Sequence, residues 1–162
     1  MARNIVKVFV IHTVISVTCY LIFFTNVGFD ENINTFTVLI VASTLYIACA
    51  FVVLKPIEKS ALSVLPLIAW ILLISISCIA SQSVDSYMFF WFISPVGILF
   101  FDPIYSFILS IFTEEKLFGN YDVIFAIFAN LSVQIPALLI LLGMFLKSIY
   151  MKKIKKSKAE TD

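Results

Sequence analysis

The chain has few charged residues and few glycines for its length. Of its 162 residues, 13% are Asp, Glu, Lys or Arg, and 4 are glycine. Soluble domains carry about 25% charged residues. A chain with so little charge lacks the groups to cover a water-exposed surface, so the composition excludes an ordinary soluble domain. We expect a lipid bilayer to surround most of the chain.

Metal-ligating and redox-active side chains are equally scarce. There is a single histidine, His12, and each of the three cysteines lies in a different apolar run, so no C-x-x-C pair exists. The sequence contains no H-E-x-x-H, no G-x-S-x-G and no phosphate-binding glycine loop. It also lacks a folded basic domain of the kind that binds nucleic acid. We therefore expect no enzymatic activity, no metal, no cofactor and no nucleic-acid partner.

Hydrophobic residues make up 62% of the chain and gather in long runs. A helix needs about 20 apolar residues to cross a bilayer. Such runs occupy residues 5–24, 36–54, 61–80 and 123–146. They show no alternation of apolar and polar residues, which disfavours porin-type strands. The first run is too long for the core of a signal peptide, so we expect a retained span. The pattern predicts one all-α integral membrane domain over residues 1–162, with four transmembrane helices.

A fifth apolar segment, residues 87–113, is interrupted. Pro95 and Gly97 break its first half, and Asp102 followed by Pro103 is typical of a helix start. We expect two short helical pieces joined at residues 94–97 and broken again before Asp102. Non-helical backbone at membrane depth is tolerated only where protein or water covers it. The segment is therefore predicted to be a broken re-entrant or interfacial element on the outer face.

Positive charge predicts the orientation, because Lys and Arg in short flanking segments stay in the cytoplasm. If residues 87–113 turn back, every positive residue except Lys116 lies on one side; if they cross, the positive residues divide almost evenly. We therefore predict cytoplasmic termini and a location in the inner membrane of a bacterial cell. The polybasic tail, residues 147–162, is then a topology anchor held by anionic lipid, or a site for an acidic partner. Its anchoring residues are Lys152, Lys153, Lys155 and Lys156.

Three polar residues inside the predicted spans are candidate functional groups. His12 forms a stripe with Ser16 and Cys19 on one helical face, and Asn130 lies one turn before Gln134. Such groups either hydrogen-bond between helices or line a path for a substrate or proton. Pro136 follows Gln134 and removes the backbone bond to the carbonyl of Ser132. We expect a kink there.

The predicted outer segment is rich in aromatic residues. Trp91, Asp102 and Tyr105 are its candidate contact residues. Tryptophan and tyrosine favour the membrane–water boundary, which indicates an interfacial belt, and they also dominate binding hot spots. Asp102 is the one carboxylate within this apolar stretch and suits a helix N-cap.

Three functions remain open at the level of sequence. The first is a small multi-pass protein that acts by contact with a membrane protein or an incoming toxin or phage component. Short, motif-poor, multi-span chains of this kind often serve bacteriocin immunity or phage and plasmid exclusion. The second is a small transporter or channel component lined by His12, Asn130 and Gln134. The third is an accessory subunit of a larger membrane complex.

Overall fold

The computed structural model describes most of the helical framework, namely residues 2–26, 35–81, 94, 96–97, 99, 127 and 130–159. Within these ranges the chain is helical apart from short connections, and no strand occurs among them. The predicted all-α class is confirmed for this part of the chain.

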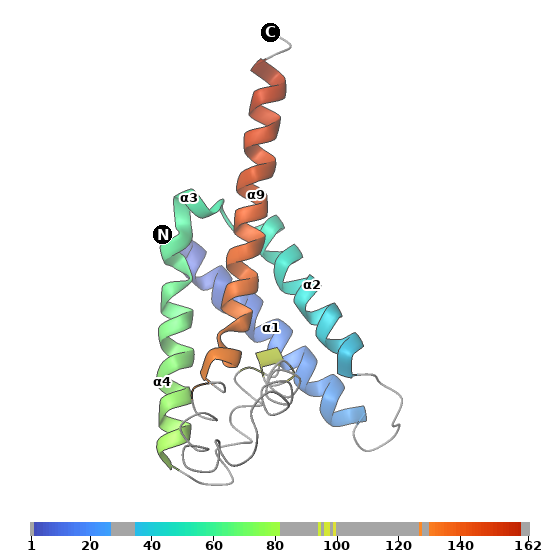
Figure 1. Ribbon diagram of the computed structural model, residues 1–162, viewed down its shortest axis with the longest axis vertical. Helices are drawn as coiled ribbons and strands as arrows, with labels where there is room; N and C mark the ends of the chain where they lie inside the picture. Colours follow the sequence, from blue (N-terminus) through green and yellow to red (C-terminus); the bar gives the residue numbers. More distant parts are fainter. Residues whose placement is uncertain are drawn as a thin grey trace, which may run out of the picture.

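Four long helices form the framework (Figure 1). The elements are α1 (Ala2–Asn26), α2 (Thr35–Val53), α3 (Ile57–Ser60), a 3-10 turn η1 (Ala61–Ser63), α4 (Leu65–Ser81) and α9 (Ile135–Ala159). Successive long helices run in opposite directions, so the start of α1, the end of α2 and the start of α4 meet at one end of the bundle. Among the described helices, α2 and α9 make the most extensive contact.

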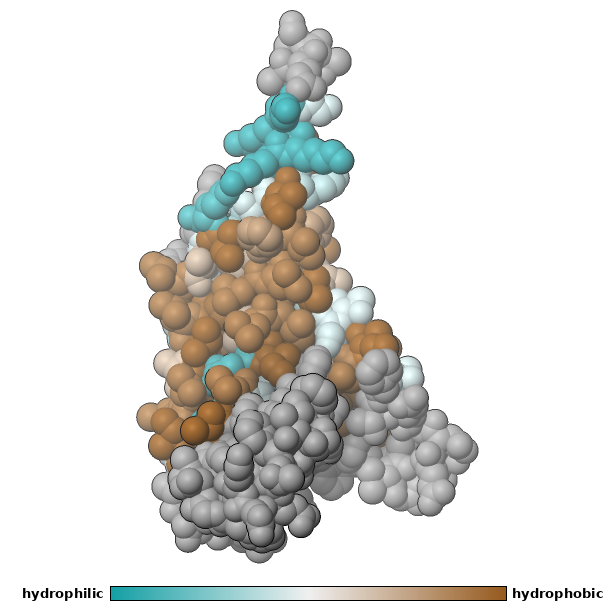
Figure 2. Space-filling view, viewed as in Figure 1, coloured by the Kyte–Doolittle hydropathy of each residue, from teal (hydrophilic) through white to brown (hydrophobic). Residues whose placement is uncertain are grey.

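The outer surface of this bundle is apolar. Large side chains such as Val6, Val52 and Leu73 are exposed, and Figure 2 shows apolar residues over the middle of the visible face. Two helices are long and apolar enough to cross a membrane, Ala2–Ile22 and Asn130–Ser157, and the apolar helices Thr37–Val53 and Ala61–Ser77 are shorter. A surface of this kind is poorly suited to water and well suited to lipid.

The third apolar run is not one continuous helix. Residues 61–63 form the turn η1, and α4 begins only at Leu65. Pro66 therefore lies in the first turn of α4, where its missing N–H has no intrahelical partner to lose. The proline starts this helix and does not kink it.

Pro136 interrupts the last helix as the sequence predicts. Residues 130–133 are helical, Gln134 forms a turn, and α9 starts at Ile135. The Gln134 N–H donates to the Leu131 carbonyl at 3.2 Å, a tighter loop than that of an α-helix. In Figure 1 the short piece before α9 turns away from the α9 axis.

The predicted boundary between span and tail at residue 146 is not a structural boundary. The helix α9 continues to Ala159 and projects beyond the other helices, carrying a hydrophilic band near its end (Figure 2). Residues 149–157 are all exposed. Leu, Lys and Met favour helix and no glycine or proline follows Gly143, so nothing in the sequence ends the helix at the edge of the apolar run. The predicted anchor lysines Lys152, Lys153, Lys155 and Lys156 therefore lie on a helix.

Part of the interrupted segment packs against the short helical piece, residues 130–133, that precedes α9. Ser94, Val96 and Leu99 are buried, and the Ser94 hydroxyl donates to the Val133 carbonyl at 3.2 Å. A Cβ on Gly97 would lie 2.7 Å from the carbonyl oxygen of Ser132. The predicted join at residues 94–97 needs correction, because Val96 and Gly97 are helical and only Ser94 is seen outside a helix. The rest of residues 87–113, including its predicted turn back, lies outside the described residues.

Candidate functional site

A buried asparagine ties the start of α1 to the connection between α2 and α4. The Asn4 side-chain amide donates to the Ser63 hydroxyl at 2.8 Å, and its carbonyl oxygen accepts from the Lys55 backbone N–H at 3.4 Å. Ser63 in turn donates to the Ser60 carbonyl at 2.6 Å. Asn4 is only 5% exposed, and its contact with Ser63 is buried. One side chain thus fixes where the connection sits relative to α1.

Two lysines cap the C-terminal end of α2. The last carbonyls of a helix lack intrahelical donors and carry partial negative charge. The Lys147 ammonium from α9 donates to Leu54 at 2.7 Å and to Val52 at 3.1 Å, and the Lys7 ammonium from α1 donates to Val53 at 3.1 Å. Helix α2 ends here because Pro56 disfavours helical backbone at Lys55. The caps join three helices at one end of the bundle.

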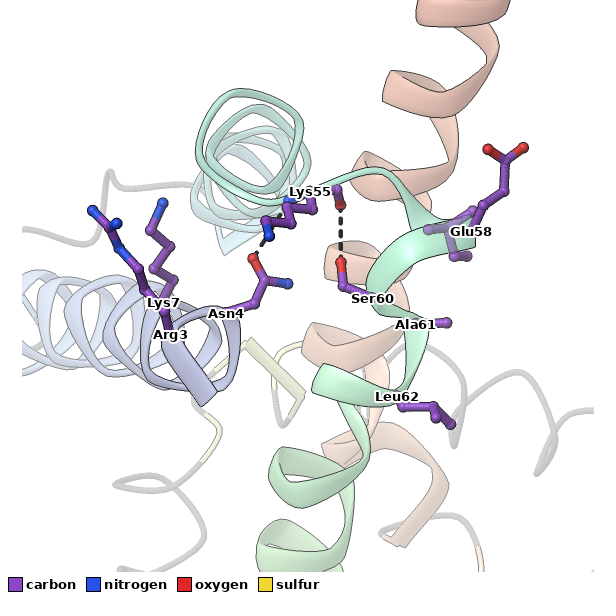
Figure 3. Close-up of a pocket in the computed structure, with 9 residues that line it drawn as sticks. Arg3, Asn4, Lys7, Lys55, Glu58, Ser60, Ala61 and Leu62 are labelled. Carbon is purple, nitrogen blue, oxygen red and sulfur yellow. Dashed lines mark hydrogen bonds between the residues drawn. The ribbon is translucent and has the colours of Figure 1, made fainter. Parts of the chain in front are cut away.

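A basic pocket of about 490 Å³ opens beside these contacts (Figure 3). Its lining residues are Arg3, Asn4, Lys7, Lys55, Ile57, Glu58, Ser60, Ala61 and Leu62. We call this the basic pocket. In Figure 3 Arg3 and Lys7 stand side by side on α1, and the Glu58 carboxylate points away from them.

The one acidic group of the basic pocket is engaged elsewhere. The Glu58 carboxylate forms an ion pair with Lys152 of α9. Hydrogen bonds from Lys152 and then Ser148 lower the pKa of Glu58 below its usual value. Arg3, Lys7 and Lys55 therefore determine the charge of the basic pocket, which is positive.

His12 lies in a buried polar cluster between α1 and α2. Its Nδ1 is 3.0 Å from the Tyr46 hydroxyl, and the Ser16 hydroxyl is 3.2 Å from the same oxygen. Tyr46 is fully buried and His12 is 2% exposed. The predicted stripe of His12, Ser16 and Cys19 faces the core. Its chemistry is that of hydrogen bonding between helices.

The other two polar candidates, Asn130 and Gln134, lie at the end of the bundle away from the basic pocket. The Ser75 hydroxyl of α4 donates to the Asn130 side-chain oxygen at 2.5 Å, so Asn130 joins two helices. The Gln134 amide nitrogen and oxygen are buried without a partner among the described residues. Neither the basic pocket nor the groove described next is lined by His12, Asn130 or Gln134. The contacts of His12 and Asn130 favour the hypothesis of contact between helices over that of a lined path.

An apolar groove of about 300 Å³ separates α1 from α2 at the end away from the lysines. Its lining residues are Val14, Ile15, Thr18, Cys19, Ile22, Thr37, Val38, Val41, Ala42, Leu45 and Cys49. We call this the α1–α2 groove. Several of its residues are small, and both of its cysteines are free thiols.

Comparisons with protein-family models, with curated proteins and with solved structures find no match for this chain. The predicted outer contact residues Trp91, Asp102 and Tyr105 lie outside the described residues.

Sequence reasoning missed two features of the site. The predicted polar candidates do not include Tyr46, although a buried tyrosine in the middle of an apolar run usually has a hydrogen-bond partner. The positive-charge rule predicts only that Arg3, Lys7 and Lys55 orient the chain in the membrane. The spacing of Arg3 and Lys7, one helical turn apart, could have indicated that they act together.

Proposed function

We propose that the chain is a four-span membrane protein with cytoplasmic termini that acts by contact with another membrane protein. The direction of the long helices supports this topology, because it brings the helix ends that carry basic side chains together at one end of the bundle. Arg3, Lys7 and Lys55 gather at the basic pocket, and Lys147 contacts the same end of α2. Lysine and arginine are retained on the cytoplasmic side. The lysine-free end of the described bundle then faces outward.

The topology is tested by labelling single cysteines in a variant without Cys19, Cys49 and Cys78. A cysteine at Lys116 is expected to react with an impermeant thiol reagent in intact cells, and a cysteine at Lys158 only after the cells are opened. Reaction at Lys158 but not at Lys116 in intact cells would show that residues 87–113 cross the bilayer. The four-span proposal would then be wrong.

The α1–α2 groove is the main structural support for contact with another membrane protein. In membranes, helices associate by close packing, and interfaces are rich in small residues. The groove is lined by Thr18, Cys19, Ala42 and Cys49 between larger apolar side chains, and Val41 is 52% exposed. This lining suits side chains of a transmembrane helix of a partner. The 300 Å³ volume takes a few such side chains.

The position of the groove favours a partner that reaches the outer leaflet. Ile22 and Thr37 line it, close to the ends of α1 and α2 that lie away from the lysines. In the proposed orientation this is the outer half of the bilayer. An incoming toxin or phage component would meet it there, as the immunity or exclusion type of function requires. A resident membrane complex, for which the chain would be an accessory subunit, is the other partner class.

The test is photo-crosslinking in native membranes from a probe residue at Leu45, which lines the groove and is 43% exposed. We expect one discrete adduct, and we expect Thr18→Phe to remove most of it by filling the groove. Thr44→Phe is the matched control. Both threonines are exposed and donate to the carbonyl one turn earlier at 2.8 Å, but only Thr18 lines the groove.

Two results would contradict the groove as the contact. One is an adduct that survives Thr18→Phe. The other is an equal loss in Thr18→Phe and Thr44→Phe, which would indicate a general effect of a bulky aromatic residue. The identity of the adduct separates the partner classes, because a subunit of a resident complex is present without challenge, whereas a toxin or phage component gives an adduct only after it is added.

A further inference from the structure

We propose that the basic pocket binds the phosphate group of an anionic phospholipid. This inference rests on the membrane location of the bundle and not on contact with a partner protein. It gives the cations at this end a role beyond orienting the chain.

The basic pocket presents three cations from two parts of the chain. Arg3 and Lys7 come from one face of α1, and Lys55 comes from the connection after α2. Glu58 is paired with Lys152, and no other acidic residue lines the pocket. Three cations around one opening favour a phosphate, whose oxygens accept several hydrogen bonds at once.

Donors remain available for such a ligand. An ammonium group has three N–H donors and a guanidinium has five. Lys7 uses one donor on the Val53 carbonyl at 3.1 Å, and Lys55 contacts Asn4 through its backbone N–H and not its ammonium. Arg3 is exposed and has no ion-pair partner among the described residues. The pocket is therefore built from neighbouring elements held in place by Asn4, with its charges still open.

The surface below the basic pocket suits acyl chains. Val10 and Val14 continue the helical face of Arg3 and Lys7, and they are 54% and 59% exposed. On the other side, Leu62 lines the pocket and is 60% exposed. A lipid thus finds cations at the level of its headgroup and apolar side chains below them. A soluble phosphate would use only the first of these features.

The depth of Lys7 fits the same ligand. It lies within the apolar run of α1, one turn deeper than Arg3. An ionisable residue there is costly unless its donors are paired. The Val53 carbonyl accepts from Lys7, and an anionic headgroup at the bilayer surface can accept from its remaining N–H groups. The volume of about 490 Å³ is many times the roughly 30 Å³ of one water, and leaves room for a headgroup with its glycerol.

The test is native mass spectrometry of the full chain in neutral detergent, titrated with phosphatidylglycerol and, separately, with phosphatidylcholine. The variant is Arg3→Gln with Lys55→Gln, which leaves the Lys7 and Asn4 contacts in place. Loss of two cations is expected to weaken phosphatidylglycerol binding about 30-fold. The comparison variant is Lys153→Gln with Lys155→Gln, which removes the same charge from two anchor lysines on the exposed end of α9 and so measures the general attraction of this end for anionic lipid.

Tight binding of phosphatidylglycerol over phosphatidylcholine, weakened about 30-fold in the pocket variant and much less in the comparison variant, would support the proposal. Equal losses in both variants would indicate general attraction to the basic end and would overturn it. Glycerol phosphate, which lacks acyl chains, is the remaining probe. If it competes at the same concentration as the lipid, the ligand is a soluble phosphate and the lipid assignment is wrong. Because no partner is present, these results are independent of the crosslinking test.

Discussion

Gly143→Val is expected to destabilise the bundle by about 3 kcal/mol, among the largest effects of any single substitution. Gly143 lies where α9 crosses α2. A Cβ added there would meet the Ala50 Cβ at 2.7 Å and the backbone carbonyl oxygen of Ile47 at a still closer approach. A flexible side chain could move aside, but backbone cannot do so without separating the helices. The favourable helix propensity of a non-glycine residue, about 1 kcal/mol at most, does not offset this.

The measurement is unfolding in mixed micelles with increasing SDS, followed by tryptophan fluorescence. Leu142→Val is the control, since it places the same β-branched residue one position earlier on a side chain that is 43% exposed. It is expected to change the free energy of unfolding by less than about 0.5 kcal/mol. Equal stability of Gly143→Val and Leu142→Val would contradict the close crossing of α2 and α9.

Tyr46→Ala is expected to cost about 3–5 kcal/mol, because it removes a fully buried aromatic ring and leaves a cavity between helices. Tyr46→Phe keeps the ring and removes only the hydroxyl, which leaves His12 and Ser16 without that partner. Its expected cost is about 1–2 kcal/mol. The same SDS unfolding measurement separates packing from hydrogen bonding at this position.

A double-mutant cycle tests whether His12 acts through Tyr46. With His12→Leu and Tyr46→Phe, we expect a coupling energy near 1 kcal/mol, within the range for hydrogen bonds between membrane helices. Tyr150→Ala is the control for loss of a tyrosine, since Tyr150 is 56% exposed and contacts Phe51 at the surface. Zero coupling, with full stability of Tyr46→Phe, would contradict the cluster.

The apolar runs alone were sufficient to predict the helical class and the approximate helices. The ends of the expected run 5–24 lie within three residues of the ends of α1 (Ala2–Asn26). The ends of the expected run 36–54 lie within one residue of the ends of α2 (Thr35–Val53). Local chemistry also predicted the interruption at Pro136, because a missing N–H acts on its own helix. These features depend on residues close together in the chain.

Hydropathy and local breaking residues were less reliable guides to where helices end or are interrupted. The end of the last span was predicted at residue 146 from hydropathy, but the helix continues to Ala159, because backbone hydrogen bonds extend through lysines as readily as through leucines. Val96 and Gly97 are helical, although proline and glycine nearby predict a break there. The role of the glycine is in packing between segments, which the local sequence does not show. Gly97 lies against the backbone of residues 132–133, a contact that disfavours any larger residue.

The sequence by itself determined three properties of the chain. These are its preference for lipid, the approximate positions of its helices, and the positive charge that marks one side. Only the tertiary structure decided which of these charges share a pocket and which cap a helix. It paired His12 with Tyr46, brought Lys147 to the end of α2 and turned Glu58 toward Lys152. The physical reason is that these contacts join residues far apart in the chain. Their partners depend on how the helices cross, and a close approach such as that of Gly143 to Ile47 sets that crossing.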